Sequence, residues 1–306
     1  MHLTPGGAPD WCPDPRVLKV TVGGHCVRRE SKSQAPRKPR KCLVCLNLLC
    51  LAVVSLPFFI CELGLVSPVH RGFFCDDMSI RYPEQRGDTV SDTLLISVGI
   101  LITSFAIVFG ECHRVSRQRS LNTCPREGYL SAIYRQLLPF LFGSALGQSL
   151  TNAAKLSAGR LRPNFLSICK PEGLNCTSGF IDTYRCIGDA GAVTEARKSF
   201  YSGHASFALY SMLYLSFYLQ VRMTWRGARL LRPLLQFVLV LLALYTGFTR
   251  ISDYRHHPSD VAVGFMQGAL VAYWVAFHIS DMFKQKRSQQ VSVPPQTDIP
   301  ETFTNC

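Results

Sequence analysis

The chain has 306 residues, of which 47% are hydrophobic, and its formal net charge is +13. The hydrophobic residues are concentrated in blocks of membrane-spanning length, which favours one integral membrane domain over one or two soluble ones. The excess of Lys and Arg does not indicate a nucleic-acid partner, because these residues flank the apolar blocks and no basic surface interleaved with aromatic residues occurs.

Taken in chain order, the apolar blocks predict an all-α, polytopic membrane protein with six transmembrane helices. Residues 1–41 are rich in Pro, Gly, Ser, Lys and Arg and are expected to form a disordered, basic cytosolic arm. Residues 42–283 are expected to form the six-helix membrane domain, and residues 284–306 a cytosolic tail. The predicted spans cover approximately residues 43–66, 93–112, 129–155, 204–221, 234–248 and 258–279.

The positions of the charges predict the orientation of these helices. The arm, the turns at 113–128 and 222–232, and the tail carry the excess Lys and Arg, which places them and both chain ends in the cytosol. The other three loops then face the outside or a lumen. One of them holds Asn175 in an Asn-Cys-Thr glycosylation acceptor, which is usable only on that side.

Four Cys lie in these outer loops, where an oxidising compartment would allow disulfides. The sequence leaves the pairing open, with Cys176–Cys186 and Cys169–Cys186 as the two candidates. Cys42, Cys45, Cys50 and Cys61 lie in or beside the first apolar block and are expected to act as small hydrophobic residues at lipid depth.

Three short polar blocks interrupt the second half of the chain, each at the end of an apolar helix on the predicted outer side. In the first, Lys155 and Arg162 are seven residues apart. If the third span continues as a helix as far as Pro163, both cations lie on one face and form an anion clamp. The plainer alternative is a pair of interfacial cations whose stems lie along the membrane.

The second block opens the fourth span with Ser202, Gly203 and His204. Ser202 suits the N-cap, and the free N–H groups at a helix N-terminus bind phosphate, which Gly lets approach the backbone closely. His204 in the first turn is then placed to reach a bound group. An ordinary cap followed by an interfacial His explains the same residues.

The third block connects the fifth and sixth spans. Pro258 fits the first helical position, so Asp260 lies in the first turn, where its carboxylate is expected to reach back to His256. Such a contact would fix the imidazole tautomer and leave one ring nitrogen free to attack. Arg250 ends the fifth span beside this group. The alternative is an Asp that stabilises the helix dipole and a solvated pair of His.

Together the blocks read Lys-x6-Arg-Pro, Ser-Gly-His and Arg-x5-His-x3-Asp, and with them the sequence strongly resembles the lipid phosphate phosphatase family, the type 2 phosphatidate phosphatases. The similarity extends from about Leu51 to Phe283 and includes the segments 71–75, 159–163 and 229–233. The segments 196–200 and 256–260 look most like the vertebrate type 3 member. Tyr201 stands where the wider superfamily often has Pro, and Thr249 where Ser is common.

The resemblance implies six transmembrane helices around a core of the phosphatidic acid phosphatase type 2 and haloperoxidase kind. It implies hydrolysis of phosphatidate, lysophosphatidate, sphingosine 1-phosphate and ceramide 1-phosphate at the extracellular or lumenal face, without a metal or another cofactor. His256 would form a phosphohistidine, Asp260 would orient it, and His204 would serve the leaving group and then water. The phosphoryl oxygens would be held by Lys155, Arg162, Ser202, the Gly203 N–H and Arg250.

Other functions explain the sequence less completely. A catalytically silent relative that acts in adhesion or scaffolding would be expected to lose motif residues, and all of them are present. Integrin binding through Arg86, Gly87 and Asp88 is weaker still, because such triplets usually occur by chance. A transporter would be expected to repeat its polar residues in two halves. We expect residence in the plasma membrane, with the Golgi and the endoplasmic reticulum as alternatives, and leave a homo-oligomer open.

Overall fold

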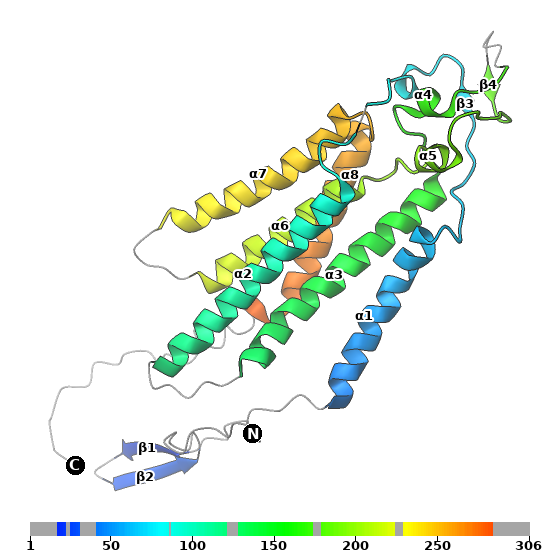
Figure 1. The fold of residues 1–306 in the computed structure, drawn as a ribbon. Helices are drawn as coiled ribbons and strands as arrows, with labels where there is room; N and C mark the ends of the chain where they lie inside the picture. The colour runs from blue at the N-terminus through cyan, green and yellow to red at the C-terminus, as the bar shows by residue number, and fades with distance from the viewer. Residues whose placement is uncertain are drawn as a thin grey trace, which may run out of the picture.

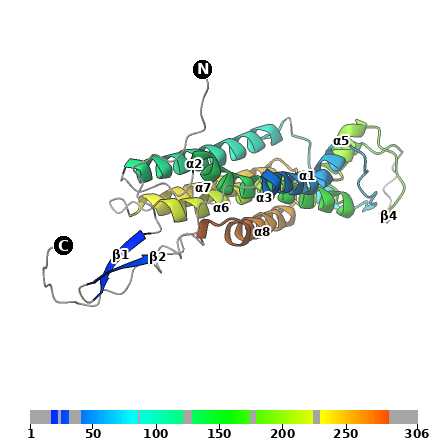
Figure 2. The same cartoon turned by 90° about the horizontal axis from the view of Figure 1, so that it is seen from below.

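The computed structural model of the chain describes residues 17–22, 25–30, 41–85, 87–120, 128–173, 179–223 and 229–283. In this part of the chain, long helices run side by side in one bundle (Figure 1, Figure 2). They are α1 (Lys41–Glu62), α2 (Asp92–Ser120), α3 (Tyr129–Ala158), α6 (Gly203–Arg222), α7 (Leu231–Ser252) and α8 (Pro258–Trp274), which continues as the π-helical turn η2 (Val275–Ile279). Each begins within a few residues of a predicted span, but α2 continues from its predicted end at Cys112 to Ser120.

Helix α6 is the centre of the bundle and contacts α2, α3, α7 and α8. Three Tyr hydroxyls, one helical turn apart on α6, donate to backbone carbonyl groups of its neighbours: Tyr210 to Phe140 (2.7 Å), Tyr214 to Gln136 (2.9 Å) and Tyr218 to Ile107 (3.3 Å). These bonds satisfy buried polar groups where aromatic rings also fill the core, so α6 is fixed in register against α2 and α3.

Glycines on α8 allow it to approach the start of α6 closely. A Cβ atom at Gly264 would lie 2.6 Å from the Ser202 carbonyl oxygen, and Gly268 faces the Ser206 backbone in the same way. Because Gly has no side chain at these positions, the backbones of α6 and α8 approach closely, and the N-termini of the two helices meet at one end of the bundle.

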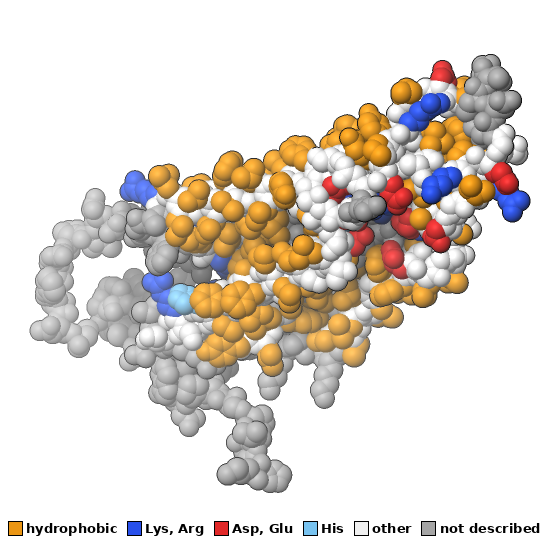
Figure 3. Space-filling view, turned by 45° about the horizontal axis from the view of Figure 1, so that its top comes forward, with side chains coloured by type: hydrophobic (Ala, Val, Ile, Leu, Met, Phe, Trp, Pro, Cys, Tyr) orange, Lys and Arg blue, Asp and Glu red, His pale blue; other side chains and the backbone are white. Residues whose placement is uncertain are grey.

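The membrane character of the bundle is confirmed by four helices that are long and apolar enough to cross a bilayer: Cys42–Glu62, Asp92–Gln118, Leu231–Ser252 and Pro258–Ile279. Exposed hydrophobic side chains cover most of the bundle in Figure 3, while acidic side chains gather with several basic ones at one end and basic side chains alone lie at the other. Helices α3 and α6 are not among these four, and they bury polar side chains such as Gln136, Asn152 and Ser211. A helix enclosed by other helices can cross a membrane without a strongly apolar surface, because it need not face lipid. The count of six spans stays a prediction.

Short elements form a layer over the end with the acidic side chains, which we call the cap (residues 67–85, 159–173 and 179–202). Strands β3 (Phe73–Phe74) and β4 (Phe180–Ile181) pair antiparallel within it. It also holds the 3-10 turn η1 (Met78–Ile80) and the helices α4 (Phe165–Cys169) and α5 (Ala190–Glu195). Its small apolar core includes Phe73, Ile80, Leu161, Phe165 and Val193.

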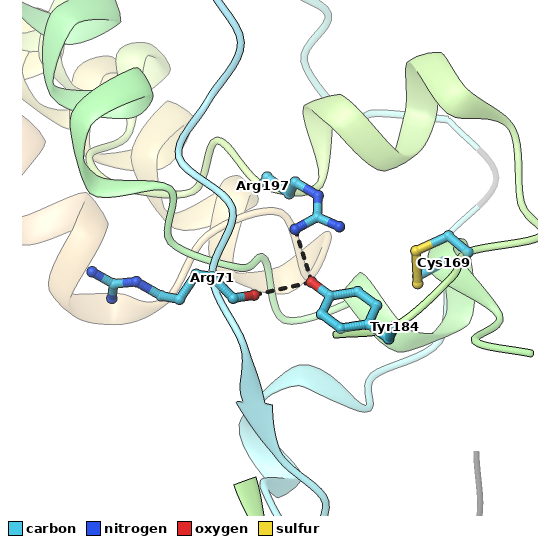
Figure 4. The surroundings of a disulfide bond; sticks show 5 residues. Arg71, Cys169, Tyr184 and Arg197 are labelled. Atoms are coloured by element: carbon cyan, nitrogen blue, oxygen red, sulfur yellow. Dashed lines mark hydrogen bonds between the residues drawn. A yellow bond between two sulfur atoms is a disulfide. The ribbon is translucent and has the colours of Figure 1, made fainter. Parts of the chain in front are cut away.

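A disulfide between Cys169 and Cys186 closes the cap, which confirms one of the two predicted pairings. Beside it, the Tyr184 hydroxyl accepts a hydrogen bond from Arg197 (2.8 Å) and donates one to the Arg71 carbonyl oxygen (3.0 Å), as Figure 4 shows. Cys75 is also disulfide-bonded. Cys176 and the predicted glycosylation site Asn175 lie outside the described residues.

Strands β1 (Val17–Val22) and β2 (His25–Glu30) form an antiparallel hairpin within the segment predicted to be a disordered arm. The β-branched residues in both strands, such as Val20 and Val27, favour extended backbone. The division of the chain at residues 41 and 284 stays a prediction.

Candidate active site

The three polar blocks meet at the cap end of the bundle. Lys155 lies in the last turn of α3, Arg250 in the last turn of α7, and the N-termini of α6 and α8 bring His204 and Asp260 to the same end. The side chains of Ser202, His204, Arg250, His256 and Asp260 are all buried. Residues as far apart in the sequence as Lys155 and Asp260 are therefore brought into one site.

The first block reaches the site by a different route from the one predicted. Helix α3 ends at Ala158 because Gly159 adopts a left-handed conformation (φ +53°) and its N–H bonds to the Lys155 carbonyl oxygen. The expectation of one continuous helix from Lys155 to Pro163 is therefore wrong. Arg162 instead lies in the cap, where its backbone N–H donates to the Ala196 carbonyl oxygen (2.8 Å).

The second block matches its prediction closely. Ser202 is the N-cap of α6, and its hydroxyl accepts a hydrogen bond from the Ala205 N–H (3.3 Å). The Ser202 N–H donates to the Asp260 carbonyl oxygen (3.1 Å), which joins this block to the start of α8. A Cβ atom at Gly203 would lie 3.6 Å from the Lys155 ammonium, so that cation lies against the N-terminus of α6. A cation and free N–H groups together form an anion-binding surface.

The contacts of His256 define its tautomer. Its Nδ1 lies 2.7 Å from the Ser199 carbonyl oxygen, which can only accept, so Nδ1 carries the proton and Nε2 keeps its lone pair. Burial, and then the positive charges of Arg162, Lys155 and Arg250, hold the pKa of His256 well below its ordinary value. His256 is therefore a neutral imidazole, close to three cations, with one nitrogen available as a nucleophile.

Asp260 does not make the expected contact with His256. Its carboxylate accepts hydrogen bonds from the Ser199 hydroxyl (2.6 Å), Arg160 Nη1 (2.5 Å) and the His257 N–H (3.2 Å), and it lies 3.2 Å from His257 Nδ1. The reason is local: Asp260 is the third residue of α8 and completes a capping box with the N-cap residue His257. Asp260 and His256 are instead connected through Ser199.

Residues of the loop before α2 and Asp92, the first residue of α2, also contact the site, although none of them belongs to the three polar blocks. The Val90 carbonyl oxygen lies 3.0 Å from both Arg250 Nη1 and His204 Nε2. The Asp92 carboxylate lies 3.3 Å from His204 Nδ1, and the Asp88 carboxylate 3.2 Å from Arg250 Nη2. No spacing pattern predicts these contacts, since the loop lies about 160 residues before Arg250.

Two arginine side chains retain buried donors that the described protein groups do not use. Arg162 pairs through Nη2 with Glu195 (3.4 Å), and Arg250 pairs through its two Nη atoms, but the Nε of each is buried and has no partner within the described residues. A buried N–H of a charged group without an acceptor is costly. An anion that bridges these donors would remove that cost.

The bundle of apolar helices holds two Arg, one Lys and a neutral His together at one end. This arrangement is typical of a membrane-embedded protein with an anion site suited to phosphoryl transfer. The family comparison agrees. The model of the PAP2 superfamily matches residues 136–283, which include all eight predicted catalytic and phosphate-binding residues.

The chain is also similar to proteins named phospholipid phosphatase. It is 48% identical to phospholipid phosphatase 2 of Mus musculus over 261 residues, which cover 84% of this chain and 92% of that protein. The corresponding protein of Homo sapiens is 49% identical over 249 residues (80% and 85%), and phospholipid phosphatase 1 of Rattus norvegicus is 44% identical over 256 residues (83% and 90%).

The chain therefore belongs to the phospholipid phosphatase family of the PAP2 superfamily. No solved structure matches it significantly. The resemblance to the type 3 member stays a prediction, because these relatives carry the names of types 1 and 2.

Proposed function

We propose that this enzyme hydrolyses lipid phosphate monoesters through a phosphohistidine at His256, without a metal ion. The observation that supports this most strongly is the arrangement around His256, a neutral imidazole near Arg162, Lys155 and Arg250. The Nε–H of both Arg162 and Arg250 is buried and has no partner among the described residues. Preorganised cations and N–H groups stabilise the charge of a phosphoryl group in transfer as a metal ion would.

In the first step, His256 Nε2 attacks phosphorus and the bond from phosphorus to the lipid oxygen breaks. His204, which enters this step in its protonated form, donates a proton to that oxygen and becomes neutral, so the lipid leaves as a neutral alcohol. The phosphorylated imidazole is positively charged and keeps its Nδ1 proton, and this N–H donates a hydrogen bond to the Ser199 carbonyl oxygen (2.7 Å). In the second step, water attacks phosphorus, His204 takes the proton, and His256 leaves as the neutral imidazole.

We further propose phosphatidate, lysophosphatidate, sphingosine 1-phosphate and ceramide 1-phosphate as substrates, on the family resemblance. The names of the relatives support a phospholipid substrate. In the proposed topology α3 and α6 complete six spans, and the cap and the active site face the exterior or a lumen, with the plasma membrane as the main location. The excess Lys and Arg at the other ends of the helices support this orientation.

The proposal is tested by measuring phosphate release from phosphatidate by the purified protein in detergent, with and without EDTA. We expect equal rates, and inhibition by vanadate, which adopts the five-coordinate geometry of the transition state. A His256→Ala variant recovered from the same membrane fraction is the control for contaminating phosphatases. Strict dependence on Mg²⁺ would overturn the metal-free mechanism, and no phosphate release by the wild type would overturn the function.

A further inference from the structure

The loop before α2 is bound along the connection between α7 and α8. We call its described residues, 82–85 and 87–91, the strap. The Tyr82 ring stacks on Tyr254, with 4.6 Å between ring centroids. The Thr89 N–H and hydroxyl donate to the two carboxylate oxygens of Asp253, at 3.0 and 2.7 Å. Because a stacked ring pair and a two-point hydrogen bond hold it, the strap has a defined position over the third polar block.

Asp88 is the charged residue of the strap that reaches the phosphate-binding cations. Its Oδ1 accepts a hydrogen bond from Arg255 Nε (2.8 Å) and from Arg250 Nη2 (3.2 Å). Burial alone would raise the pKa of Asp88, but the charges and hydrogen bonds of Arg250 and Arg255 hold it below its ordinary value. The carboxylate is therefore ionised and shared by the two Arg.

The strap binds the two terminal nitrogens of Arg250 but not its Nε. Nη1 donates to the Val90 carbonyl oxygen (3.0 Å) and Nη2 to Asp88, while Nε is buried without a partner in the described structure. The guanidinium is planar and rigid, so fixing its two terminal nitrogens also fixes the direction of the Nε–H. The same Val90 carbonyl oxygen lies 3.0 Å from His204 Nε2, which ties the proposed acid to the same segment.

We infer that Asp88 is a positioning residue that holds Arg250 in the orientation that binds the phosphoryl group. This inference rests on the proposed function. It also gives the Arg86-Gly87-Asp88 triplet a part in the active site. A partner protein that recognised the triplet would have to compete with Arg250 and Arg255 for the Asp88 carboxylate. Arg86 itself lies outside the described residues.

Three substitutions at one position separate the charge of Asp88 from its shape. Asp88→Ala removes both acceptors, Asp88→Asn keeps the shape without the charge, and Asp88→Glu keeps the charge. Glu84→Gln is the matched control, because Glu84 is an exposed carboxylate four residues away in the same strap. The kinetic constants for a lipid phosphate and the inhibition constant of orthophosphate are measured for each folded variant.

Loss of a group that orients a metal ligand typically costs roughly 10–100-fold, and we take the same range for a group that orients a phosphate-binding side chain. We expect Asp88→Ala to raise the KM and the orthophosphate inhibition constant together by about that factor. Asp88→Asn should fall between Ala and wild type, Asp88→Glu should recover most of the binding, and Glu84→Gln should behave as wild type. In an Arg250→Lys background, Asp88→Ala should add little, because the side chain it positions has already been changed.

Two outcomes would overturn the inference. In one, Asp88→Ala lowers only the yield of folded protein and leaves the orthophosphate inhibition constant unchanged, as a purely structural role predicts. In the other, orthophosphate binds more tightly to the variant, which would make Asp88 a competitor of phosphate. If Asp88→Ala does not fold, the comparison of Asn with Glu decides. Stabilisation by vanadate in a thermal melt gives the same comparison without turnover, so it remains informative if the proposed function fails.

Discussion

Replacing Ser199 by Ala tests the connection between Asp260 and His256. Ser199 is completely buried; its hydroxyl donates to Asp260 (2.6 Å), and its carbonyl oxygen accepts from His256 Nδ1 (2.7 Å). Its backbone N–H donates to the Arg160 carbonyl oxygen (3.0 Å). Alanine keeps the backbone groups and removes only the hydroxyl, so the variant breaks the link at a single atom.

The structure sets the expected size of the effect. A hydrogen bond to a charged group contributes about 1.5–3 kcal/mol. Asp260 retains Arg160 and His257 as donors, so Ser199→Ala should cost close to the lower value, or roughly a tenfold loss of kcat/KM. Asp260→Asn also removes the charge that faces Arg160 and places an amide N–H against donors, so it should cost about 3 kcal/mol, or roughly a hundredfold.

The assay is kcat/KM for a short-chain lipid phosphate in detergent, measured for both single variants and the double variant. Because both substitutions act through one link, the double variant should lose little more than Asp260→Asn alone. Ser211→Ala is the control, because among the described residues its buried hydroxyl donates to carbonyl groups of its own helix and to no residue of the site. If Ser199→Ala matches wild type while Asp260→Asn loses about 10⁴-fold, as a direct Asp–His contact predicts, the link through Ser199 is wrong.

Three further outcomes follow. Activity should fall as the pH drops through the lowered pKa of His256, since protonation removes the Nε2 lone pair. Arg162→Gln removes one cause of that lowered pKa, so the acidic limb of the kcat/KM profile should move to higher pH. An unmoved acidic limb would contradict this. Asn175→Gln should lower the mass of the cell-expressed protein as glycosidase treatment does, and an unglycosylated wild type would contradict the topology. Non-reducing mass spectrometry should find Cys169 linked to Cys186, and free thiols at both would contradict the cap.

The sequence predicts the helices well because apolar blocks and helix caps are local signals. Ser202 is the N-cap that was expected, and Pro258 begins α8 as expected. The predicted third span, 129–155, ends close to the end of α3 at Ala158, but the continuation of that helix to Pro163 was wrong. Seven-residue spacing suggested the continuation, although Gly159 was a better signal for a helix end.

The internal contacts of the site were less predictable. The His256 Nδ1–H donates its hydrogen bond to a backbone carbonyl group, which any residue type at position 199 could supply. Asp260 was assigned to His256 by analogy with catalytic triads, although its position three residues after His257 also fits a capping box. The contacts of Asp88 with Arg250 and Arg255 depend on how a distant loop packs, and no spacing in one sequence contains that information.

The most direct test of the account is to trap the covalent intermediate. The substrate is an aryl phosphate that carries a labelled phosphate and an acidic phenol, and the phenolate leaves without a general acid. A His204→Ala variant should therefore complete the first step but hydrolyse the intermediate slowly. After an alkaline quench, which preserves phosphohistidine, peptide mapping should place the label on His256, and His256→Ala should take up none. Both variants must first be shown to reach the membrane with the same glycan as wild type. Label on His204, or labelled protein in the His256→Ala variant, would contradict the assignment of His256 as the nucleophile.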